Sequence, residues 1–204
     1  LEVKDRAFAT ELVYGSLRMQ GRHDHFIAAA SDRALEQIDP KALIVLRIGT
    51  HQLKEMRVPS HAAIYESVEL AKKVVGKSTS SFINAILRKI DSLDFEVLPI
   101  PNQEFSRLAL EYSHPEWIVS SYFDSLKSED EVSNLLKANN SAAKPVLIAW
   151  PGLATIDELF DAGALPITTS GVAASFDGNP GDIPAIRQRR AGVQDLGSQI
   201  VVEK

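Results

Sequence analysis

Apolar residues along the first 90 positions recur at steps of three and four, which places them on one face of successive helices. The clearest case is 58–90, where two amphipathic helices are joined by a turn at Gly76. Further helices are expected at 5–19, 24–31 and 41–56. These patterns predict one all-α domain over residues 1–92. Its most buried segment should run from Leu43 to Ile48, where the helix is apolar almost all round.

Small polar residues and prolines indicate where these helices begin. Asp39 followed by Pro40 is typical of an N-cap and the first helical position. Ser60 can cap the first helix of the 58–90 pair, and any residue from Ser78 to Ser81 can cap the second. Three further starts are expected as capping boxes: Ser113 with Glu116, Ser128 with Glu131, and Thr155 with Glu158. At the first of these, Tyr112 and Trp117 could form a hydrophobic staple.

The pattern changes after residue 92. Pro99 and Pro101 indicate a connection over 91–103. Helices are then expected before a short strand at 145–150, a helix at 156–162, and short strands and turns up to 195. The chain is therefore predicted to be mainly α, with an all-α helical bundle at 1–92 and a smaller α+β domain at 103–195.

The two halves of the chain differ in net charge. The net charge of −5 conceals 14 Lys and Arg against 10 Asp and Glu in residues 1–90, and 8 against 17 in residues 91–204. Such an imbalance favours contact between the first half and a polyanion. The absence of Cys excludes disulfides and thiolate metal sites, and a cytoplasmic location is expected. No apolar run approaches the length needed to cross a bilayer, so no membrane contact is expected.

The text VPSHAAIYESVELAKKVVGK, followed by SSFINAILRKI, resembles the NusB-like domain of bacterial ribosomal RNA cytosine-5 methyltransferases, the RsmB (Sun or Fmu) family. A match of this density is far more specific than a single short motif. The matching positions are His61, Ala62, Ala63, Glu66, Val68, Glu69, Leu70, Ala71, Lys72, Phe82, Asn84, Ala85, Leu87 and Arg88.

The second half also resembles this family, in its linker domain. SHPEWIVSSYF, LLKANN and AGVQDLGSQIV carry the likeness, and the last of these fits the motif VQD-x-x-SQ at Gln194, Asp195, Ser198 and Gln199. That motif opens the family's S-adenosylmethionine-binding domain, so residues 196–204 are expected to begin such a domain. One departure is that Ile148-Ala149-Trp150 stands where the family has Arg-x-Asn after the first strand, which puts that motif's role in doubt.

The resemblance implies that the parent protein is an enzyme. It would transfer a methyl group from S-adenosylmethionine to one cytosine of 16S ribosomal RNA. The catalytic cysteines and the Rossmann-like catalytic domain would lie beyond Lys204. This part alone is therefore expected to be inactive and to bind no cofactor. The alternative is a non-enzymatic NusB-like module for RNA binding or transcription antitermination, and a protein-interaction bundle is a third, weaker possibility.

Candidate RNA-binding residues are the basic and amide side chains that the apolar faces leave outside. If the first helix ends near the 76–78 turn, they should form one patch. They are Arg18, Arg22, Lys72, Lys73, Lys77, Asn84, Arg88 and Lys89. The scattered histidines do not have the spacing of a metal site, so no metal is expected. The motifs leave open the modified cytosine and the oligomeric state.

Overall fold

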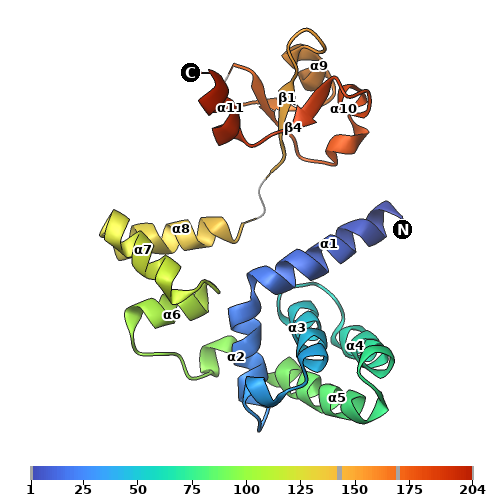
Figure 1. Cartoon of the computed structure of the whole chain (residues 1–204), viewed down its shortest axis with the longest axis vertical. Coiled ribbons are helices and arrows are strands. Elements are labelled where there is room, and N and C mark those ends of the chain that lie inside the picture. Colours follow the sequence, from blue (N-terminus) through green and yellow to red (C-terminus); the bar gives the residue numbers. More distant parts are fainter. Residues whose placement is uncertain (1, 142–143, 169–170, 204) are drawn as a thin grey trace. The chain divides into compact units, whose positions relative to one another are not determined.

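Helices dominate the residues that the structure describes, and the strands among them lie in the last third of the chain (Figure 1). The computed structural model describes residues 2–141, 144–168 and 171–203. The chain divides into two units, Leu1–Asn140 and Ser141–Lys204. The expected class, mainly α with a smaller α+β part, is confirmed.

The first five α-helices of the first unit form a bundle around one hydrophobic core. Its fully buried side chains include Ile27, Leu46, Leu87 and Ile90. The bounds are α1 (Val3–Arg18), α2 (Gln20–Ala30), η1 (Leu35–Gln37), α3 (Pro40–Lys54), α4 (Ser60–Val74) and α5 (Lys77–Ser92).

Helix α3 lies at the centre of the bundle and contacts the other four helices. It begins as predicted, because Asp39 accepts hydrogen bonds from the amides of Lys41 and Ala42 at 2.9 and 3.1 Å. The prediction that Leu43 to Ile48 is the bundle's most buried segment is wrong, since Ile44 is 53% exposed and the continuous buried run of α3 is Gly49 to Gln52. Arg47 donates two hydrogen bonds to Asp24, at 2.7 and 2.8 Å, which pairs its charge within the bundle.

The α4–α5 joint differs from the prediction in its caps. Pro59 precedes α4, and the hydroxyl of Ser60 instead donates to Asp91 at 2.7 Å. Gly76 precedes α5, which already begins at Lys77, so none of the residues 78–81 is its cap. Gly76 has a φ of 121°, a conformation that side chains with a Cβ rarely adopt. The turn is therefore set by glycine rather than by a serine hydroxyl.

The capping box predicted at Ser113 is wrong. Helix α7 begins at Glu116 after Pro115, while Ser113 has a φ of 55° and its hydroxyl accepts from the amides of Gly21 and Arg22 at 2.9 and 3.4 Å. Ser113 thus satisfies the first free amides of α2, which lets α2 continue through Gly21 instead of starting after it. Trp117 is 72% exposed, so its staple is also not formed.

At the other two predicted sites, Ser128 is confirmed as the N-cap of the helix Glu129–Asn139, and Thr155 with Glu158 is confirmed as a full capping box. The hydroxyl of Ser128 accepts from the amide of Glu131 at 3.4 Å. Thr155 and Glu158 exchange both bonds of a capping box, at 3.2 and 3.3 Å.

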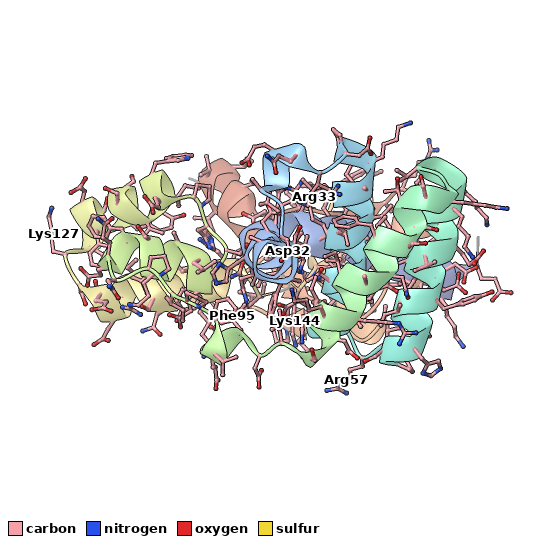
Figure 2. All side chains as sticks on the ribbon, turned by 90° about the horizontal axis from the view of Figure 1, so that it is seen from below. Asp32, Arg33, Arg57, Phe95, Lys127 and Lys144 are labelled. Carbon is pink, nitrogen blue, oxygen red and sulfur yellow. The ribbon has the colours of Figure 1, made fainter. Side chains whose placement is uncertain are left out.

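The connection after α5 packs against the bundle. It contains η2 (Phe95–Val97), and Figure 2 shows Phe95 on this segment. The guanidinium of Arg22 lies 4.3 Å from the centre of the Phe95 ring, and Leu98 is buried in the bundle core. Helices α6 (Glu104–Glu111), α7 (Glu116–Leu126) and α8 (Glu129–Asn139) follow, with a core of their own, and α6 contacts α2.

The second unit is a small antiparallel sheet flanked by short helices. Its strands, in the order β2-β3-β1-β4, are β1 (Val146–Ala149), β2 (Leu165–Pro166), β3 (Ala173–Ser175) and β4 (Ala191–Val193). The helices are α9 (Ile156–Asp161), η3 (Pro180–Asp182), α10 (Pro184–Arg187) and α11 (Leu196–Glu203). Gln199 of the VQD-x-x-SQ motif is buried and donates to the carbonyls of Gln194 and Leu147 at 2.9 and 3.4 Å, which ties α11 to the sheet.

Candidate nucleic-acid interface

A groove of about 430 Å³ lies between α4 and α5, and we call it the α4–α5 groove. It forms because Gly76 turns the chain back, so that α5 packs along α4. Steps of three and four residues then bring the side chains of each helix to one side. The groove is lined by His61, Ile64, Tyr65, Val68, Glu69, Lys72, Asn84 and Arg88.

Two cations and one amide of this groove are candidate residues from the sequence. Nε of Arg88 donates to Oδ1 of Asn84 at 3.3 Å, across one helical turn. Nζ of Lys72 donates to a carboxylate oxygen of Glu69. This hydrogen bond raises the pKa of Lys72, so the ammonium remains charged at neutral pH. Lys72 and Arg88 are both exposed. The groove therefore presents to solvent the guanidinium of Arg88, the ammonium of Lys72 paired with Glu69, and an amide.

An aromatic ring accompanies these charges. Tyr65 is 62% exposed, and it lies one turn after His61 and about two turns before Lys72 on the same side of α4. Exposed aromatic rings beside cations are the usual means of holding unpaired bases in single-stranded nucleic acid. Tyr65 and His61 were not among the candidates from the sequence. Their seven- and eleven-residue spacing to Lys72 was the available signal.

The other predicted residues do not join this groove. Arg18 and Arg22 line a separate pocket of about 320 Å³, together with His51, Glu55 and residues of α6 and α8. There Arg18 lies 3.5 Å from Glu11, and Arg22 lies 3.9 Å from Glu55. These acidic neighbours offset both charges.

Lys73 lines a cavity between α1, α3 and α4, and Lys77 and Lys89 are exposed on α5. Helix α1 ends at Arg18, beside the second pocket and not beside the 76–78 turn. The eight residues therefore do not line one groove.

In the described ranges, no group of three or more His, Cys, Asp or Glu could hold a metal ion. Within those same ranges no helix has the length and hydropathy of a membrane span.

Comparison with known proteins identifies the bundle. Residues 1–92 match the model of the NusB family. The first 92 residues are a NusB domain. A Mycobacterium tuberculosis protein named "Putative methyltransferase Rv1407" is 35% identical over 207 residues, covering 97% of this chain and 45% of the relative. The ribosomal RNA small subunit methyltransferase B of Vibrio cholerae is 32% identical over 140 residues, covering 69% of this chain and 31% of that protein.

The likeness extends to a solved structure. The crystal structure of PH0851 superimposes with a TM-score of 0.70 at 18% identity, covering 98% of this chain and 46% of that one, which shows a shared fold. The chain spans less than half the length of these relatives. It is therefore homologous, as the sequence motifs suggested, to one part of the small subunit methyltransferase B proteins.

Proposed function

We propose that this chain is the RNA-recognition part of an S-adenosylmethionine-dependent methyltransferase that modifies carbon-5 of a cytosine in 16S ribosomal RNA. The names of its relatives and the NusB domain support the class of substrate. The observation that carries the proposal is the α4–α5 groove, where Tyr65, Lys72, Asn84 and Arg88 meet on a NusB domain.

Each of these side chains has a distinct task in the proposed complex. The charges of Lys72 and Arg88 pair with phosphates, and the planar guanidinium of Arg88 can do so through two hydrogen bonds. The ring of Tyr65 stacks on an unpaired base. The amide of Asn84 both donates and accepts hydrogen bonds, so it can bond a base edge or a ribose hydroxyl.

The chemistry itself would come from the rest of the parent protein. Methylation at carbon-5 of cytosine requires a nucleophile that adds to carbon-6, and this chain contains no Cys to supply a thiolate. The bound S-adenosylmethionine would supply the methyl group. In this proposal the 204-residue chain transfers no methyl group on its own. It holds the ribosomal RNA in the cytoplasm while another domain reacts.

The test is a salt titration of binding to labelled 16S ribosomal RNA. In the double variant Lys72→Glu, Arg88→Glu, the affinity for RNA should fall at least about tenfold. Each phosphate contact that is lost also loses the favourable release of counterions from the RNA. The slope of log Kd against log salt should decrease by about 1.5. Tyr65→Ala should weaken binding by about 1 to 3 kcal/mol, through lost stacking, without changing the slope.

The matched control is Lys127→Glu, Lys144→Glu, which reverses two exposed lysines that do not line the groove. It should leave the slope close to that of the wild type. If the groove variant and the control have the same slope, RNA does not bind in the groove. A contrary result is that the full-length parent binds ribosomal RNA and methylates none of it in the presence of S-adenosylmethionine. That result would favour the alternative function, a non-enzymatic NusB-like module.

A further inference from the structure

A carboxylate lies in the α4–α5 groove, which the proposed function assigns to RNA. Glu69 is one of the residues that line the groove, and its side chain is 33% exposed. Close to phosphates, this negative charge would weaken RNA binding by repulsion. A carboxylate that also accepted hydrogen bonds from the RNA would offset this repulsion.

The pairing of Glu69 with Lys72 leaves much of its bonding capacity free. Nζ of Lys72 donates to Oε1 of Glu69, and Oε2 has no hydrogen-bond partner among the residues that the structure describes. An ionised carboxylate has about four acceptor sites, so both of its oxygens can accept again. The ammonium of Lys72 therefore holds the carboxylate in the groove without saturating it.

A hydrogen-bond donor reaches the same groove from α5, which returns along α4 in Figure 1. Oδ1 of Asn84 accepts from Nε of Arg88 at 3.3 Å, so the amide nitrogen of Asn84 keeps both hydrogens for a ligand. The register of the two helices follows from the 2.7 Å hydrogen bond between Ser60 and Asp91. Counted inward from that bond, Asn84 lies about 3 Å from the level of Glu69 along the helices.

An acceptor with two oxygens beside a donor matches the Watson–Crick edge of guanine. Guanine presents O6 as an acceptor, followed by two adjacent donors, N1–H and the N2 amino group. The carboxylate of Glu69 can accept from both donors while the amide of Asn84 donates to O6. Adenine, cytosine and uracil each place an acceptor next to the donor that a carboxylate could bind, and two facing acceptors repel. Tyr65, one turn before Glu69, supplies the ring on which the base stacks.

We propose that Glu69, together with Asn84, makes the α4–α5 groove selective for an unpaired guanine. The inference rests on the proposed function, because it requires RNA to lie in the groove. The guanine is unpaired, since its Watson–Crick edge faces the protein. Hydrogen bonds from this base offset the repulsion between Glu69 and the phosphates, and RNA without the guanine is subject to the repulsion alone. Glu69 is thus a specificity-determining residue.

The test measures binding of the chain to short oligouridylates that carry one central guanosine, inosine, adenosine or cytidine. The guanosine RNA should bind at least about fivefold more tightly than the adenosine and cytidine RNAs, as expected for one bidentate contact to a base. Inosine keeps O6 and N1–H but lacks the N2 amino group, so its RNA should bind with intermediate affinity. Glu69→Gln should lose the preference for guanosine. Asn84→Ala should weaken the guanosine and inosine RNAs alike, because both bases keep O6.

Glu66→Gln is the matched control, since Glu66 is exposed on the same helix but does not line the groove. It removes the same charge and should leave the order of the four RNAs unchanged. Equal binding of the guanosine and adenosine RNAs by the wild type would overturn the inference. A uniform rise in affinity for all four RNAs in Glu69→Gln would do so as well, because Glu69 would then only repel phosphates.

Failure of this inference differs from failure of the proposed function. An unchanged salt slope in Lys72→Glu, Arg88→Glu would place the RNA outside the groove and overturn both. A reduced slope in that variant, together with equal binding of the four RNAs by the wild type, would overturn the selectivity for guanine alone.

Discussion

Two buried histidines are the most unusual residues of the bundle. His23 is fully buried, and its ring lies 5.3 Å from that of His51 in an edge-to-face arrangement. Burial, followed by the nearby His51, lowers the pKa of His23 to about 3, and Arg22 and Arg47 act in the same direction. Burial also lowers the pKa of His51, although Glu11, 3.3 Å away, partly opposes the effect. Both rings are therefore neutral in the folded protein.

Stability should consequently decrease as the pH falls below about 6.5. The unfolded chain takes up a proton on each histidine near that pH, whereas folded His23 does so only near pH 3. At pH 5.5 His23 alone should cost about 1.4 kcal/mol relative to pH 7.5, and the lowered pKa of His51 acts in the same direction. Urea unfolding at the two pH values measures this loss. His23→Gln should reduce the difference, and His61→Gln, at an exposed site, should not. An unchanged difference in His23→Gln would show that another group titrates.

At the scale of elements, α1 and α3 approach one another at Gly15. A Cβ at this position would lie 2.2 Å from Nε2 of the buried His51. Gly15→Ala should therefore destabilise the protein by about 1 to 3 kcal/mol through overpacking. This effect opposes the gain of up to about 1 kcal/mol that alanine brings to an exposed helical position.

Thr10→Ala is the control for this variant, because it also adds helix propensity to α1 but at an exposed site. The urea midpoint should fall for Gly15→Ala and change little for Thr10→Ala. A rise in both urea midpoints would mean that α1 and α3 can move apart at Gly15 without loss of stability.

Sequence patterns predicted the helices of the bundle and the start of α3 at Asp39, but not how α2 and α5 begin. The spacing of apolar residues depends on which face of a helix is apolar, and the helices α3 and α4 agree with the spacing in the sequence. The caps of α2 and α5 depend on Ser113, which is distant in sequence, and on the backbone conformation of Gly76. Neither property is encoded in a local pattern.

The candidate interface was predictable to a similar extent. Lys72, Asn84 and Arg88 could be selected as polar residues outside the apolar faces, and the structure places them in one groove. Tyr65 was not selected, because an aromatic residue on a helix is usually part of the core, although its seven-residue spacing to Lys72 places it on the same side of α4. Arg18 and Arg22 satisfied the same criterion as Lys72, yet the position of α6 and α8 places them in another pocket.

At the scale of the molecule, residues 1–140 should be more stable than residues 1–92, although the NusB match ends at 92. The shorter piece loses Phe95, which packs on Arg22 and Phe26, and the buried Leu98. Loss of such side chains costs at least about 2 kcal/mol. Thermal melts of both pieces, with Leu98→Ala in 1–140 as the intermediate case, measure the difference. Equal melting temperatures would show that the bundle is complete without this segment.

The hydrogen bonds from Gly21 and Arg22 to Ser113 also determine when the bundle can finish folding. Their partners are 92 and 91 residues apart, so α2 has emerged from the ribosome long before its acceptor is made. At usual synthesis rates this interval is about 5 to 20 s. During that time the start of α2 must leave its amides to water. The first turn of α2 therefore receives these hydrogen bonds only once the corner between α6 and α7 has been made.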